Sequence, residues 1–197
     1  MLDRFNFAPV FIGHWKGLTK DTDTGPVPDW GARGVVAGVP LLVIGLMAWK
    51  DVELSFPGVL LTAVSLLSGA SLTVFAQLSS LRLKLTEWFD DDDTSRDSDK
   101  DALDESVSHL MAATIACVFA AVIIVVGMVT SKPDAVSLSG VAAYAAGGIS
   151  AYIALLYVML IPRLYYAYVN VNRVRGNLNG FEIDNTSRRM RRVRRHW

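Results

Sequence analysis

The side chains that could do chemistry in this chain are few and widely spaced. It has three histidines (His14, His109 and His196) and one cysteine, Cys117, which lies inside an apolar run. No metal-ligand spacing, nucleophile motif or phosphate-binding glycine loop occurs. We expect the three histidines to lie far apart in the folded chain. The sequence therefore predicts a protein that is not an enzyme, with no catalytic residue, no metal site and no cofactor.

An acidic run at residues 97–105 has the alternating aspartates that also begin an EF-hand calcium loop. Such a loop needs glycine at its sixth position and glutamate at its twelfth. Here these positions hold Ala102 and Ser108. We therefore interpret the run as a solvated charged segment.

Polar and small residues form a stripe along one face of the second apolar run, if that run is helical. The stripe contains Thr62, Ser65, Gly69 and Thr73, with Gln77 beside it. In lipid such groups need hydrogen-bond partners, so this face should contact protein or water. One interpretation is close helix packing, with each hydroxyl bonded to a preceding carbonyl of its own helix. The other is the lining of a pore in an oligomer.

A second series of small residues repeats along the fourth apolar run, at Gly140, Ala143, Gly147 and Ala151. Helices associate in lipid by close van der Waals approach, which small residues permit. This series should pack against a small-residue face of the third run, or against a second copy of the chain.

The elements that must position these residues are four apolar runs, at residues 34–49, 57–78, 107–130 and 138–161. About 20 helical residues are needed to span the ~30 Å hydrocarbon core of a bilayer. Three runs meet this length, and the first needs residues 30–33 or a thinner bilayer. The predicted fold class is an all-α, polytopic integral membrane protein with four transmembrane helices in two hairpins.

The positive charges orient these helices. Of 19 Lys and Arg residues, only Lys50 and Lys132 fall in the two loops that close the hairpins. Because Lys and Arg are retained in the cytoplasm, both termini and the central segment should be cytoplasmic. We expect a multi-pass protein of the inner (plasma) membrane.

The charge zones divide the chain into five parts. They are an interfacial N-terminal arm (1–32), the first hairpin (33–81), a cytoplasmic helical extension with an acidic linker (82–106), the second hairpin (107–161), and a second extension with a basic tail (162–197). The third helix should begin near residues 101–106. The second helix should run about three turns past the membrane, because apolar residues recur there at helical spacing.

The tail carries six arginines in its last eleven residues. They are Arg188, Arg189, Arg191, Arg192, Arg194 and Arg195. Near an anionic leaflet each could contribute about 1 kcal/mol of binding free energy. Anionic lipid headgroups are the favoured partner, ahead of the acidic linker of the chain itself. Nucleic acid is disfavoured, because no aromatic base-stacking fold accompanies the arginines.

The function favoured by these patterns is non-enzymatic. We expect a small membrane protein that self-associates, or binds a partner membrane protein, through its cytoplasmic charged segments. A pore-forming or membrane-perturbing effector of the toxin or phage-defence type is the alternative. A small-solute transporter is disfavoured, because coupled carriers usually place an ionisable group within the membrane and the three strong runs contain no Asp, Glu, Lys or Arg.

Overall fold

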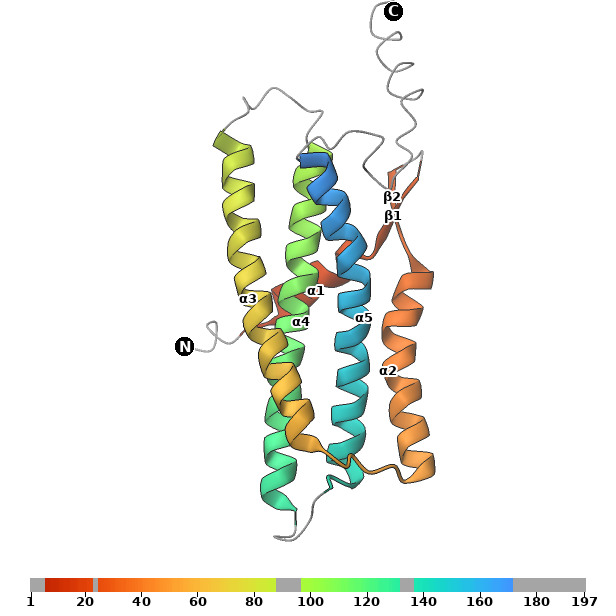
Figure 1. Ribbon diagram of the computed structural model, residues 1–197. Helices are drawn as coiled ribbons and strands as arrows, with labels where there is room; N and C mark the ends of the chain where they lie inside the picture. The colour runs from red at the N-terminus through yellow and green to blue at the C-terminus, as the bar shows by residue number, and fades with distance from the viewer. Residues whose placement is uncertain (1–5, 23–24, 88–96, 132–136, 172–197) are drawn as a thin grey trace, which may run out of the picture.

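The computed structural model describes residues 6–22, 25–87, 97–131 and 137–171. These residues form, in order, α1 (Ala8–Gly17), β1 (Thr19–Thr22), β2 (Gly25–Pro28), α2 (Trp30–Lys50), α3 (Pro57–Glu87), α4 (Asp97–Thr130) and α5 (Gly140–Val171). The helices α2, α3, α4 and α5 are each long and apolar enough to cross a membrane. This confirms the predicted helical architecture with four helices that could span a membrane (Figure 1).

A small antiparallel sheet that was not predicted joins α1 to α2. In it, β1 pairs with β2 from Thr19 opposite Pro28 to Thr22 opposite Gly25. The backbone N–H of Asp29 continues the pairing by donating to the carbonyl of Leu18 at 3.0 Å. The sheet therefore fixes where α2 begins relative to α1.

The helix α2 has a defined cap at each end. The Asp29 carboxylate accepts a 3.0 Å hydrogen bond from the Ala32 N–H, which satisfies one of the free donors of the first turn. At the other end, Asp51 takes a left-handed conformation with φ of 48°. The helix has 21 residues. Residues 30–33 thus supply the length that the apolar run 34–49 lacks.

The other long helices run beyond the apolar runs. The helix α3 continues to Glu87, as its apolar spacing predicted, and α4 begins at Asp97, earlier than the expected start near 101–106. The helix α5 passes through Pro162, which lacks the N–H that would bond to the carbonyl four residues earlier. As a result α3, α4 and α5 extend well past the level at which α2 begins (Figure 1).

The helix α4 lies at the centre of the packing. It contacts α3, α5 and α1, whereas α2 packs on α5 and has no comparable contact with α3. The resulting row is α3, α4, α5, α2, and α1 crosses α4 at the level where α2 begins (Figure 1). The buried face of α4 is mostly small, with Ala112, Ala113, Ala116 and Ala120 at most 5% exposed. Small side chains allow neighbouring helices to approach this helix from several directions.

An apolar core joins α3, α4 and α5 where they approach the ends of their apolar runs. Leu78, Leu103, Leu110 and Leu160 are buried together, with Leu81 and Leu164 packed against them. An ion pair between Arg82 Nε and Asp104 Oδ1 at 3.2 Å also links α3 to α4. The three helices therefore remain packed together where the extension begins.

The opposite end of the bundle is closed by contacts between its two short connections. Leu54 and Leu138 exchange two backbone hydrogen bonds, at 2.8 and 2.9 Å. The Ser137 hydroxyl donates to Glu53 and the Tyr144 hydroxyl to Asp51, both at 2.5 Å. These contacts tie the α2–α3 connection to the start of α5.

Candidate functional site

Two glycines bring α1 onto α4 at close range. A Cβ atom at Gly17 would lie 2.8 Å from Glu105 Cγ and 3.1 Å from His109 Cε1, and one at Gly13 would lie 3.3 Å from Ser108 Oγ. Because Gly13 and Gly17 are four residues apart, they share one face of α1. Larger residues at these positions would push α1 away from α4.

Between the two glycines, His14 meets His109 of α4. The Nδ1 atoms of the two rings are 3.0 Å apart, and the rings are nearly perpendicular with centroids 4.6 Å apart. His14 is 2% exposed and His109 is fully buried. The expectation that the histidines lie far apart is therefore wrong for this pair. It failed because α1 folds back across the bundle, which the sequence pattern did not reveal.

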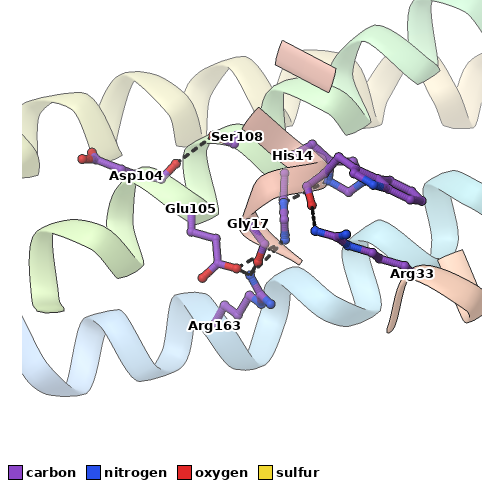
Figure 2. Close-up of polar contacts among 9 residues, drawn as sticks. His14, Gly17, Arg33, Asp104, Glu105, Ser108 and Arg163 are labelled. Atoms are coloured by element: carbon purple, nitrogen blue, oxygen red, sulfur yellow. Dashed lines mark hydrogen bonds and ion pairs between the residues drawn. The ribbon is translucent and has the colours of Figure 1, made fainter. Parts of the chain in front are cut away.

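Arg163 of α5 joins the pair to a carboxylate. Its Nη1 lies 2.9 Å from His109 Nε2 and 3.4 Å from the carbonyl oxygen of Gly17. It also forms an ion pair with Glu105 of α4. Figure 2 shows His14, Glu105 and Arg163 converging from three different helices. We call His14, Glu105, His109 and Arg163 the His14 cluster.

The hydrogen-bond geometry assigns a tautomer to each histidine. The Arg163 guanidinium can only donate, so His109 Nε2 accepts and His109 carries its proton on Nδ1. That Nδ1–H then donates to His14 Nδ1, which leaves the proton of His14 on Nε2. Within the described residues, His14 Nε2 is buried and has no hydrogen-bond partner. In this series of hydrogen bonds, Arg163 donates to His109 and His109 donates to His14, so the donors point from α5 towards α1.

The environment of His14 favours its neutral form. Burial lowers the pKa of its imidazole, and the positive charge of Arg163 lowers it further, from 6.5 to about 4. At neutral pH the cluster therefore has one negative charge on Glu105 and one positive charge on Arg163. Both charged side chains are 28% exposed, so solvent also reaches them.

Arginine and tryptophan fasten the start of α2 to α1 beside the cluster. The Arg33 guanidinium carbon lies 5.4 Å from the Trp15 ring centroid and 5.6 Å from that of Trp30, within the range of cation–π contacts. Arg33 Nη2 also donates to the Trp15 carbonyl at 3.0 Å. Trp15 and Trp30 are both exposed, as is typical of side chains at a membrane surface.

The predicted stripe on α3 faces away from the other helices. We call it the α3 stripe, and its members Thr62, Ser65, Gly69, Thr73 and Gln77 are all exposed. The hydroxyls of Thr62, Ser65 and Thr73 donate to the carbonyls four residues earlier, at 2.8 to 3.1 Å. No atom outside the helix lies within 4 Å of a Cβ built at Gly69. The stripe is therefore satisfied within α3 and is not used for packing inside this chain.

The predicted small residues of α5 have different surroundings. Ala143 is fully buried and Ala151 is half-buried. A Cβ at Gly147 would meet the Met47 side chain of α2, and one at the adjacent Gly148 would lie 3.3 Å from the Pro40 carbonyl. Gly140 has φ of +68° and open space around it, so it serves the backbone turn at the start of α5.

The six tail arginines, Arg188, Arg189, Arg191, Arg192, Arg194 and Arg195, lie outside the described residues. So do residues 90–93 of the acidic linker. The His14 cluster, by contrast, was not predicted as a site. One available signal was the pair Gly13 and Gly17 flanking His14, and another was the position of His109 on the small-residue face of α4.

The cluster places ionisable groups close to the helix segments that could cross a membrane. The apolar segments of α4 and α5 that could cross a membrane are Leu103–Thr130 and Gly140–Tyr166. Glu105, His109 and Arg163 lie near the ends of these segments. Glu105 and Arg163 lie just beyond the narrower runs 107–130 and 138–161, from which Asp, Glu, Lys and Arg are absent, and His109 lies just inside the first of them. An intramembrane or interfacial ionisable group is a functional candidate because it is costly to keep there.

The chemistry open to the cluster is proton exchange. Within the described ranges, no three His, Cys, Asp or Glu side chains are placed to hold a metal ion. The described cysteine, Cys117, is buried among apolar residues of α3, α4 and α5. A proton can be bound at His14 Nδ1 only if the hydrogen bond from His109 is broken. Comparison with known proteins gave no match: no family model fits the chain, and neither a curated protein nor a solved structure is significantly similar to it.

Proposed function

We propose that this chain is a small, non-enzymatic protein of the inner (plasma) membrane that self-associates through its cytoplasmic charged segments. One observation carries the proposal. The helices α3, α4 and α5 continue past the start of α2, at the end where α3 ends at Glu87 and α4 begins at Asp97, and they are packed together where this extension begins (Figure 1). In the sequence, the acidic linker joins α3 to α4 at this end, and the basic tail follows α5.

The proposed orientation puts both termini in the cytoplasm. Among the described residues, one basic side chain, Lys50, lies at the end of the bundle closed by Leu54 and Leu138. Arg33, Arg82 and Arg163 lie towards the other end. This distribution agrees with retention of positive charge in the cytoplasm. The two hairpins then open to the same side, and residues 51–56 and 137–139 face outward.

Cysteine labelling from outside the cell tests the orientation. In a Cys117→Ser background, a membrane-impermeant maleimide should label Glu53→Cys and Ala135→Cys and should not label Ser95→Cys until the membrane is permeabilised. Labelling of Ser95→Cys in intact cells would reverse the proposed topology. Leu66→Cys serves as an unlabelled control, because Leu66 is 70% exposed but lies within the apolar segment of α3.

Charge reversal tests the proposed association. The full chain is labelled with donor or acceptor dyes and reconstituted in vesicles of neutral lipid, so that anionic headgroups do not compete. Reversing Asp90, Asp91, Asp92 and Asp93 to Arg should weaken energy transfer between copies, as should reversing the six tail arginines to Glu. Combining both reversals should restore it. Energy transfer that both reversals leave unchanged would refute association through these segments.

Pore formation is a second candidate, favoured by the exposure of the whole α3 stripe. A helix face with hydroxyls and an amide could line water if several copies placed α3 at a common axis. Expression of the chain should then dissipate the membrane potential, and Thr73→Leu or Gln77→Leu should abolish that effect. An unchanged membrane potential on expression would reject pore formation and leave self-association as the proposed function.

A further inference from the structure

We propose that the contact between His14 and His109 is an acid-sensitive latch, which holds α1 on α4 near neutral pH and releases it in acid. We call it the histidine latch. It does not depend on whether the chain self-associates, because every group in it belongs to one copy.

The latch closes only when both rings are neutral. His109 donates its Nδ1 proton to the free lone pair of His14 Nδ1, across 3.0 Å. Protonation of His14 would put a second N–H at that position, so two donors would face each other at hydrogen-bonding distance. His109 cannot relieve this by moving its proton to Nε2, because that atom already accepts from Arg163 at 2.9 Å.

The charges around the rings disfavour an added proton. Arg163 of α5 faces His109 directly, and Arg33 of α2 contacts Trp15, the residue next to His14 in α1. Glu105 of α4 is the carboxylate of the cluster, and it is already paired with Arg163. Among the described residues, Tyr152 of α5 is a further titratable neighbour, with its ring centroid 6.2 Å from that of His14. A proton on either histidine would therefore leave the cluster with net positive charge.

The rest of the α1 contact is small enough for this change to matter. On α4 and α5 it consists mainly of the close approach at Gly13 and Gly17 and of Val10 and Phe11 packed on Ala112, Ala113 and Leu156. The contacts of Arg33 with Trp15 and of Arg163 with the Gly17 carbonyl involve the C-terminal half of α1. The helix α1 has 10 residues, and a helix of this length is marginal without its tertiary contacts. Release would uncover Ser108 and His109 on α4 and free the apolar side chains of α1 for the membrane surface.

The direction of the pH effect follows from linkage. The pKa of His14 is lower when α1 is docked, about 4, than when the ring is free, 6.5, so protons bind better to the released form. Docking is therefore fully favourable above the free value and is lost as the pH falls through this window. With these two values, the ratio of docked to released α1 should fall about 30-fold between about pH 7.5 and about pH 5.

Hydrogen exchange on the full chain in lipid nanodiscs measures this ratio. Exchange of the α1 amides is compared with the intrinsic exchange rate at each pH, which removes the chemical effect of pH itself. The protection of residues 8–17 should fall about 30-fold from about pH 7.5 to about pH 5, and that of α2 should not change. Protection of α1 that is constant over this range would refute the latch.

A matched variant separates the latch from a general acid effect. His14→Asn keeps an acceptor oxygen near the position of Nδ1 but does not titrate, so α1 should stay docked and its pH response should shrink to the part that His109 contributes. A pH response in His14→Asn as large as that of the unmodified chain would overturn the proposal. If this variant does not fold, the ¹⁵N resonances of the imidazoles in the unmodified chain still test the proposal, because they report which nitrogen of each ring is protonated. His109 should be protonated on Nδ1 and His14 on Nε2 near neutral pH, and the reverse assignment would also overturn it.

Discussion

The α3 stripe and the small residues of α5 look alike in sequence but have opposite surroundings in the structure. Gly147 and Gly148 of α5 face the side chains of Met47 and Ile44 in α2, at distances that leave no room for a Cβ atom. Gly69 of α3 has no neighbouring atom within 4 Å of the same point. One series therefore fixes the fold of a single copy, and the other is available to lipid or to another molecule.

The comparison shows what a small-residue pattern can and cannot specify. The pattern indicates that another helix can approach this helix closely, which is a local property of the helix that carries the small residues. The identity of the approaching helix depends on the rest of the chain. Here α2 packs on α5, although α3 follows α2 directly in sequence. The same pattern can therefore be internal in one helix and external in another.

The largest effect should come from filling the packed glycine. Gly148→Leu places a side chain against Ile44 and the Pro40 backbone, which must move to admit it. Overpacking of this kind costs about 1–3 kcal/mol of the free energy of unfolding. Reversible unfolding in mixed micelles measures the loss.

Gly45→Leu is the matched control for this change. Gly45 lies one residue from Ile44 in α2, but no atom of another helix lies within 4 Å of a Cβ built there. Removal of a helical glycine should be neutral or stabilising by up to about 1 kcal/mol. Equal destabilisation by Gly45→Leu and Gly148→Leu would mean that the α2–α5 contact is not what holds α2 in place.

The difference between these glycines could not be obtained from the sequence, whereas the helices themselves could. Length and hydropathy are local, so α3, α4 and α5 were predicted, together with the continuation of α3 beyond Leu81. The contact between His14 and His109 joins residues 95 positions apart. It depends on the path of the chain through β1 and β2, which no periodicity indicated. Local patterns therefore predicted the spans, and long-range packing determined the candidate site.

An intermediate effect should come from a buried hydroxyl that links two helices. Ser71 of α3 is 1% exposed, and its hydroxyl bonds to Tyr157 of α5 as well as to its own Leu67 carbonyl. Ser71→Ala should lower the free energy of unfolding by about 0.5–1.5 kcal/mol, since it removes the bond between helices. The Tyr157 hydroxyl keeps its 3.2 Å contact with the Leu67 carbonyl, which limits the loss.

Ser65→Ala is the corresponding change on the exposed side of the same helix. The Ser65 hydroxyl bonds only to the Leu61 carbonyl among the described residues, at 2.8 Å. Its removal should leave the stability of one copy unchanged within about 0.5 kcal/mol. If Ser65→Ala were as destabilising as Ser71→Ala, the outward face of α3 would be contributing to the fold of the monomer.

The smallest effect on folding, and the sharpest test of the comparison, should come from Thr73→Val. The two side chains have nearly the same shape, and Gly69, whose carbonyl accepts from the Thr73 hydroxyl, keeps its backbone bond within the helix. The stability of one copy should therefore not change measurably. If the α3 stripe contacts a second copy, loss of one hydrogen bond between helices in lipid costs about 0.6 kcal/mol, which is about a threefold weaker association.

Cysteine crosslinking locates that contact independently of its strength. In a Cys117→Ser background, Gly69→Cys should form a disulfide between copies in the membrane. Val118→Cys on α4 should not form one. Val118 is a matched control because it is 52% exposed and lies twelve residues from Thr130, the end of α4, as Gly69 lies twelve residues from Pro57, the start of α3. Crosslinking through Val118 alone would assign the contact to α4. The exposed stripe of α3 would then face lipid, and its hydroxyls would need no partner beyond the carbonyls they already bond.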